Sequence, residues 1–225
     1  MGAREDILSY LDQDGLIGEL PHPTTKWTGG NELLDTGTAY LILKLLNQTT
    51  RADFSSYSKA VKGCEAGEPG IYNKEPGRPD QITHDDIIGV VTGSVALGAT
   101  FQNDVLWYIK KNNWLDSNTG QDYWDATVKP WYLAFYTLAA GETPDVFSLL
   151  TLKAAILLDA FVGTDAGNKK LMWCIIKTIQ RKSWIIDSAI KVWESRLKSG
   201  AYGSMKRVMT AYYGEKHPFA IYCPE

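Results

Sequence analysis

The chain has 225 residues, of which 44% are apolar and 22% are charged, and its formal net charge at pH 7 is −3. These values are ordinary for a globular protein, and they exclude the strongly basic surface of a general nucleic-acid binder. The three cysteines are widely spaced and form neither a disulfide framework nor a zinc-binding pattern, so we expect a reducing compartment and no cofactor.

Apolar periodicity predicts helix along almost the whole chain, interrupted by two long loops at 12–30 and 64–83. The tail, EKHPFAIYCPE, is expected to be extended. The predicted helices span, in chain order, about 4–11, 31–48, 53–61, 84–99, 101–113, 128–140, 145–162, 168–181, 184–198 and 203–213.

The second predicted helix begins with a candidate cap and a candidate buried acid. Asn31 fits the N-cap position, and Trp27 precedes it in the loop. Asp35 follows among apolar residues, where an acid must find a hydrogen-bond donor or shift its pKa upward. Lys153 is likewise a charged residue within an apolar helix, but with a positive charge. Asp35 and Lys153 therefore either pair in the core or face one cavity.

The loop at 64–83 is long for a structureless segment of a compact domain, and such loops are usually functional or disordered. It contains Glu68, Tyr72, Arg78 and Gln81. Arg78 stands on a stiff segment beside proline, so it either pairs with a nearby acid or receives an anionic ligand.

The stretch RPDQITHDDIIGVV, residues 78–91, places polar residues at the start of an apolar helix. Thr83 and Asp86 fit a variant of the capping box, and acids in a first turn complement the helix dipole, so capping explains both Asp85 and Asp86. His84 lies at the edge of a buried face. It is either a core histidine with a hydrogen-bond partner or an acid–base group facing a pocket.

The other side of that helix carries the small residues Gly89, Gly93 and Ala96 at spacings of four and three. In a protein of this composition, such a stripe predicts close approach by a neighbouring helix.

The most apolar stretch is VFSLLTLKAAILLDAFV, residues 146–162, which contains Lys153 and Asp159. Each charge would cost about 2.5 to 3.5 kcal/mol at the centre of a bilayer, so we expect a buried helix and no membrane partner. The amino terminus has no apolar core of signal-peptide length. These features leave the location open, with a cytoplasmic protein as one expectation and a virion-associated protein as the other.

The pattern as a whole predicts one all-α domain over residues 1–225, built of stacked antiparallel helical hairpins. Helices 33–46 and 146–162 are apolar nearly all round, whereas 184–198 is amphipathic, which is typical of an enclosed inner layer and an outer layer. A partial (α/α) ring and an irregular bundle both satisfy this pattern.

The alternating helices, the Trp-rich loops, and the acids in 64–83 and at Asp85 and Asp86 resemble (α/α) six-hairpin glycosidase-like proteins. That resemblance implies a helical ring with acids and aromatic residues at one rim that bind and cleave glycans. The stretches GLIGELPHPTTKWTGGNELLDTG and PGIYNKEPGRPDQITHDDIIG are also similar to uncharacterised proteins from phage genomes, a likeness that implies no activity.

Two functions remain open, both placed at the rim where the two long loops meet the helix starts at 31 and 84. The first is a virus-encoded structural or interaction protein that holds a protein or glycan partner; it is favoured because no catalytic motif is present. The second is a glycan hydrolase or lyase with paired carboxylates. The candidate catalytic residues are His84, Asp85, Asp86, Asp35 and Glu68, and the candidate binding residues are Trp27, Asn31, Tyr72, Arg78 and Gln81.

In the catalytic hypothesis, Asp85 or Glu68 is the general acid, and Asp35 or Asp86 is the partner carboxylate. Such pairs lie about 5 to 10 Å apart, and an aromatic-lined cleft would favour hydrolysis. A flat rim, or acids that all serve as helix caps, would favour the interaction hypothesis.

Overall fold

The computed structural model describes residues 2–18, 32–73, 76–77, 82, 84–112, 130–162, 175 and 205–224. Every regular element within these residues is a helix, and two isolated β-bridges join Leu11 to Ile17 and Glu65 to Tyr72. The described part of the chain therefore confirms the predicted all-α class. The elements are α1 (Ala3–Leu8), α2 (Glu32–Leu45), α3 (Arg51–Gly63), α4 (His84–Leu97), α5 (Phe101–Asn112), α6 (Pro130–Ala139), α7 (Val146–Val162), α10 (Met205–Tyr213) and α11 (Pro218–Tyr222).

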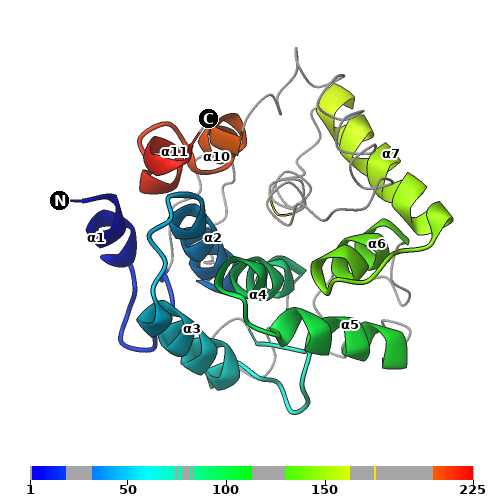
Figure 1. The fold of residues 1–225 in the computed structure, drawn as a ribbon, viewed down its shortest axis with the longest axis horizontal. Coiled ribbons are helices and arrows are strands. Elements are labelled where there is room, and N and C mark those ends of the chain that lie inside the picture. The colour runs from blue at the N-terminus through cyan, green and yellow to red at the C-terminus, as the bar shows by residue number, and fades with distance from the viewer. Residues whose placement is uncertain are drawn as a thin grey trace.

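Consecutive helices are stacked as hairpins, which confirms the predicted architecture. Close packing joins α4 to α5, α6 to α7 and α10 to α11, and α2 packs most extensively against α4 (Figure 1). The predicted helices at 168–181 and 184–198 lie outside the described residues.

Two of the turns between helices, after α4 and after α6, use the same kind of glycine cap. Gly98 and Gly141 follow α4 and α6 with φ of 73° and 91°, a left-handed conformation that costs glycine little. The next residue donates its N–H back into the last turn, from Ala99 to Ser94 O and from Glu142 to Thr137 O, each at 2.9 Å. These glycines stop one helix and reverse the chain into the next.

Helix α2 belongs to an inner layer, because all of its residues from Leu33 to Leu43 are buried. By contrast, α3 buries only Asp53, Tyr57, Ala60 and Val61. Figure 1 shows α2, α4 and α6 side by side, with α3 and α5 on their outer side. The contrast between all-round apolar and amphipathic helices therefore predicts the layers correctly in this part of the fold.

Helices α2 and α4 cross with their backbones in contact. A Cβ atom on Gly37 would collide with the backbone of Gly89, and one on Gly89 would collide with Leu33 and Leu34. A Cβ on Gly93 would meet the ring of Tyr57, whose hydroxyl donates to Val90 O at 2.6 Å. The small-residue stripe of α4 is thus filled by helix α2 and by a ring from α3, as its spacing predicts.

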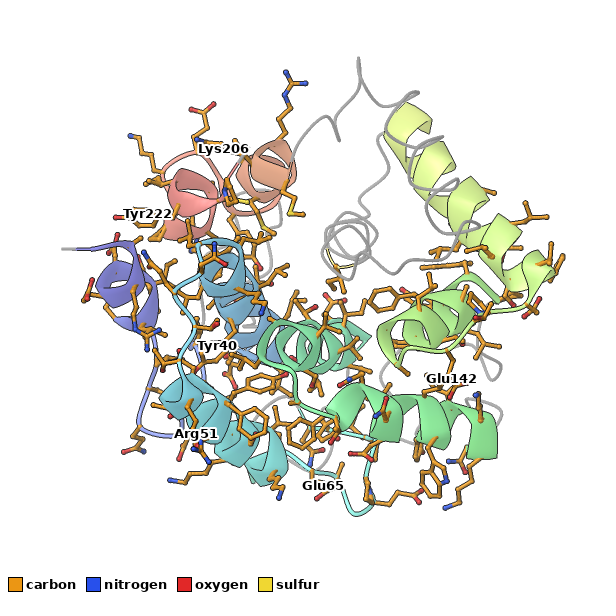
Figure 2. The ribbon with its side chains drawn as sticks, in the orientation of Figure 1. Tyr40, Arg51, Glu65, Glu142, Lys206 and Tyr222 are labelled. Atoms are coloured by element: carbon orange, nitrogen blue, oxygen red, sulfur yellow. The ribbon has the colours of Figure 1, made fainter. Side chains whose placement is uncertain are left out.

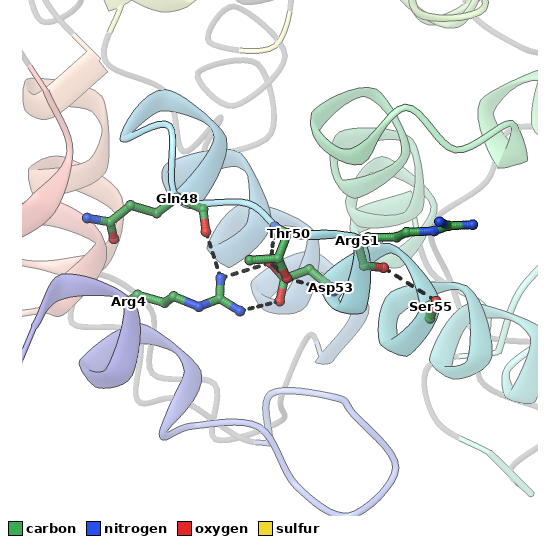
Figure 3. A network of polar contacts seen from close by, with 6 residues as sticks. All are labelled: Arg4, Gln48, Thr50, Arg51, Asp53 and Ser55. Carbon is green, nitrogen blue, oxygen red and sulfur yellow. Dashed lines mark hydrogen bonds and ion pairs between the residues drawn. The ribbon is translucent and has the colours of Figure 1, made fainter.

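A charged network ties α1 to the start of α3 (Figure 3). Arg4 donates two hydrogen bonds to the Asp53 carboxylate, at 2.6 and 2.8 Å, and a third to Gln48 O at 2.7 Å. Asp53 also forms a capping box with Thr50. Burial alone would raise the pKa of Asp53, but the hydrogen bonds from Arg4 and Thr50 outweigh burial and hold this pKa below its ordinary value.

The prediction of an extended tail is wrong, because residues 218–222 form helix α11. Pro218 occupies its first turn, and His217 acts as N-cap, its ring nitrogen accepting from Phe219 N–H. Histidine is not among the usual capping residues, and a five-residue helix shows no periodicity, so the sequence pattern gives no signal.

None of the helices in the described ranges combines the length and apolarity that a membrane span requires.

Candidate functional site

Two of the predicted partner carboxylates, Asp35 and Asp86, lie close to the crossing of α2 and α4. Asp35 precedes Gly37 by two residues, and Asp86 precedes Gly89 by three. Each is therefore within about one turn, or about 5.4 Å along its helix, of the point where the backbones touch. Asp35 and Asp86 were alternatives for one role, that of the partner carboxylate, and both lie near this crossing.

Both carboxylates are enclosed by the protein. The exposed fractions of Asp35 and Asp86 are 0%, and the residues around them on α2 and α4 are also buried. A substrate in solution cannot contact either side chain while the two helices remain packed. The packing of α2 against α4 thus separates both candidate partner carboxylates from any external ligand.

Asp85 differs from its neighbour, because it is only partly buried and faces helix α6. Burial raises the pKa of Tyr132, and the negative charge of Asp85 raises it further. Tyr136 is fully buried, so its pKa is also raised, with smaller contributions from Tyr132 and Asp85. Both phenols are therefore neutral near pH 7.

Aromatic rings form a row beside Asp85. The rings of Trp131 and Tyr132 are stacked with centroids 3.6 Å apart, and Tyr132 and Tyr136 are 6.3 Å apart and nearly parallel. These three residues are not among the binding residues that the sequence predicts. The signal was present in PWYLAFY, because two tyrosines four residues apart in an apolar helix share one face and need polar partners.

Glu68 and Tyr72 lie against a different helix, α5. Glu68 forms an ion pair with Lys111 at 2.7 Å near the end of that helix. Tyr72 is 1% exposed and meets the ring of Phe101 edge-on at 6.3 Å, and its burial raises its pKa. Glu68 and Tyr72 thus contact α5, whereas Asp85 faces α6.

The first part of the predicted loop at 64–83 is folded and packed. Ala66 N–H donates to Ile71 O at 2.9 Å, and Asn73 N–H donates to Cys64 O at 2.7 Å. Gly70, with φ of 98°, lies directly against the backbone of α5, where a side chain would collide. Turn chemistry and packing on α5 thus order a segment whose composition suggested an open loop.

Other predicted site residues lie outside the described residues: Trp27, Asn31, Arg78 and Gln81. His84 is the first residue of α4, and the structure describes its backbone but not its side chain. Among the residues that the structure does describe, no group of three or more His, Cys, Asp or Glu is arranged to hold a metal ion.

An apolar surface, which we call the α7 patch, consists of Val146, Phe147 and Leu150. Their exposed fractions are 69%, 65% and 54%. The sequence predicts enclosure for this helix because it is apolar on nearly all faces, yet the patch faces solvent. Asp145 caps the helix by accepting from Ser148 N–H at 2.9 Å, so the patch begins at a well-defined helix start.

The turn before the α7 patch is tied to α5. Lys110 forms an ion pair with Glu142 at 2.6 Å, and Figure 2 shows Glu142 beside the end of α6. On the same face of α5, Trp107 is 51% exposed, with the Lys111 ammonium 4.8 Å from its ring centroid. The charge over its ring distinguishes Trp107 from the uncharged apolar side chains of the patch.

Comparisons with family models, with curated proteins and with solved structures gave no match to this chain.

Proposed function

We propose that this chain is a non-catalytic structural or interaction protein that assembles with a second copy of itself through the α7 patch. The observation that carries the proposal is the exposure of Val146, Phe147 and Leu150 on a helix whose sequence requires enclosure. A contiguous exposed apolar surface at a helix start is typical of a protein interface.

The state of the candidate acids supports a non-catalytic role. Asp35 and Asp86 are fully enclosed, and Glu68 is paired with Lys111. A glycosidase needs one carboxylic acid to protonate the leaving oxygen while a second carboxylate attacks or activates water, and both must reach the sugar. Asp85 is the candidate acid that keeps partial exposure close to the tyrosines of α6.

The α7 patch is shaped to fit its own copy. Ala154, two turns after Phe147, is also exposed. In an antiparallel pair of α7 helices with the two-fold axis beside Leu150, Phe147 of one copy lies over Ala154 of the other. A large side chain then meets a small one at both ends, which is the self-complementarity that a two-fold dimer requires.

The area of the patch predicts a weak dimer. Three side chains that are each more than half exposed supply on the order of 600 Å² of apolar surface from two copies together. Stable interfaces bury about 1,200 to 2,000 Å², so the association is expected to be reversible and concentration-dependent.

Sedimentation velocity over a range of protein concentrations tests this proposal. The wild type is expected to shift from monomer to dimer with rising concentration, and Phe147→Asp and Leu150→Asp are expected to remain monomeric. Trp107→Asp is the matched control, because Trp107 is similarly exposed but lies on α5. A monomer at every concentration, or equal loss of the dimer in the control, would contradict the proposal.

The wider identity of the protein is part of the same proposal. The layering of α2, α4 and α6 inside α3 and α5 is in keeping with part of an (α/α) ring. The likeness of two stretches within the first 100 residues to phage sequences supports a virus-encoded structural protein.

A glycan-binding or glycan-cleaving function is the second candidate, favoured by one observation. Asp85 is partly exposed beside the stacked rings of Trp131 and Tyr132, and sugars bind to such combinations of a carboxylate and flat apolar faces. Glycan-array binding by wild type, Asp85→Asn and Trp131→Ala tests it, with Trp107→Ala as a control on α5. Binding that both site variants lose and the control retains would favour this candidate; absence of binding by the wild type would remove it.

A further inference from the structure

The carboxyl-terminal helices fold back onto the amino-terminal helix. Helix α11 contacts both α1 and α2, and α1 and α11 lie side by side (Figure 1). The Tyr222 hydroxyl donates to the Asp6 carboxylate at 3.0 Å, and Figure 2 shows Tyr222 on the side of α11 that faces α1. The ring of Tyr10, just after α1, is stacked on His217 with centroids 6.0 Å apart. We call the five residues of this junction, Asp6, Tyr10, Tyr213, His217 and Tyr222, the terminal clasp.

His217 holds the clasp together through one ring nitrogen. Its Nδ1 accepts from the Phe219 N–H at 3.2 Å, and this hydrogen bond caps α11. A ring nitrogen accepts only through a lone pair, so Nδ1 carries no proton in this arrangement and the neutral ring has its proton on Nε2. Pro218 has no N–H of its own, which leaves the Phe219 N–H as the first donor of the helix that needs an acceptor.

The imidazole is enclosed mainly by aromatic rings. Tyr213 of α10 is stacked on it at 5.0 Å, and Phe219 meets it edge-on at 4.6 Å. The ring therefore contacts Tyr10, which follows α1, and Tyr213 of α10, while it caps α11. A change in its hydrogen bonding therefore affects the attachment of α11 as well as its cap.

Protonation of His217 is incompatible with this cap. A proton on Nδ1 converts the acceptor into a donor that faces the Phe219 N–H. Tyr213 at 5.0 Å and Tyr10 at 6.0 Å attract an imidazolium, but this attraction does not restore the acceptor that the Phe219 N–H loses. The charged groups near the clasp are the Asp6 carboxylate, which already accepts from Tyr222, the exposed Glu215 and Lys216 beside His217, and Lys206 and Arg207 on α10.

We infer that the terminal clasp is a pH-sensitive latch, in which protonation of His217 uncaps α11 and loosens its attachment to α1. Histidine is the side chain whose ordinary titration range lies in mildly acidic conditions, so we expect the latch to open there. Release also uncovers the buried thiol of Cys223, which directly follows α11.

Amide hydrogen exchange measured by NMR tests the latch. Ala220 and Ile221 donate their N–H groups to His217 O at 2.9 Å, so together with Phe219 they report on the start of α11. In the wild type, their protection factors, corrected for the intrinsic pH dependence of exchange, are expected to fall at least fivefold between pH 7.5 and 5.5.

The substitution His217→Asn separates the latch from general acid effects. Asparagine retains a capping acceptor but does not titrate, so protection at Phe219–Ile221 is expected to be the same at both pH values. His84→Asn is the matched control and is expected to keep the wild-type decline. Constant protection in the wild type, or an equal decline in His217→Asn, would overturn the inference.

Discussion

The crossing of α2 and α4 and the start of α7 are similarly apolar in sequence but have opposite surroundings. Both are apolar on nearly all faces, yet Leu33 to Leu43 are buried, whereas Val146, Phe147 and Leu150 are more than half exposed. Glycines at the crossing allow two backbones to touch, whereas the side chains of the α7 patch are more than half exposed. Apolarity thus predicts that a helix seeks a partner surface, but the position of small residues decides which helix finds one within the chain.

The largest effect is expected from a side chain placed into the crossing. Gly89→Val should destabilise the protein by more than about 3 kcal/mol, because the new atoms collide with the backbone of Leu33 and Leu34, which cannot rotate away. Gly18→Ala is the control, since no atom lies within 4 Å of its added Cβ. Urea unfolding measures both free energies, and equal values would show that the crossing is not closely packed.

Truncation of a leucine in each region sharpens the comparison. Leu41→Ala, at 0% exposed, is expected to lower the free energy of unfolding by about 3 kcal/mol. Leu150→Ala should change it by less than about 0.5 kcal/mol at concentrations where the protein is monomeric. A large loss in Leu150→Ala under those conditions would mean that the α7 patch is enclosed in solution by the monomer itself.

Disruption of the Arg4–Asp53 network is expected to lower stability by an intermediate amount that depends on pH. Asp53→Asn is expected to cost about 1 to 2 kcal/mol at pH 7, since it weakens both the capping box and the partly exposed ion pair. The folded pKa of Asp53 lies below its unfolded value, so this stability is present above about pH 4 and is lost as the pH falls through the folded pKa. The difference in unfolding free energy between wild type and variant should therefore be smaller at pH 3 than at pH 7. An equal difference at the two pH values would contradict this cause.

The smallest effect is expected at the surface pair Lys110–Glu142, whose side chains are 51% and 54% exposed. Lys110→Ala should change the free energy of unfolding by about 0.5 kcal/mol or less, and high salt should reduce the difference further. Thermal unfolding in low and high salt measures this. A cost above about 1 kcal/mol would mean that the ion pair fixes the turn before α7.

Much of the fold follows from local patterns. The predicted helix at 84–99 is observed as His84–Leu97, and the one at 101–113 as Phe101–Asn112, because a glycine cap and a 3.6-residue period act over only a few residues. The small-residue stripe of α4, and the close approach of a neighbouring helix, could be predicted for the same reason. The tail was not, since α11 depends on an unusual cap and on contacts with α1.

The candidate site was predictable only in part. The polar residues at the start of α4 were visible as a group, but the sequence could not distinguish the enclosed Asp86 from the partly exposed Asp85 beside it. Successive residues of a helix point about 100° apart, so the neighbours on each side decide their exposure. Glu68 and Tyr72 likewise looked like partners of this group until packing placed them on α5.

By itself, the sequence determined most of the helices among the described residues and the glycines that end α4 and α6, because these properties depend on neighbouring residues along the chain. Only the tertiary structure decided that α4 covers α2, that α7 begins uncovered, and that His217 joins the two ends of the chain. These outcomes depend on contacts between residues far apart in the sequence, whose formation reflects packing of the whole molecule rather than any local preference.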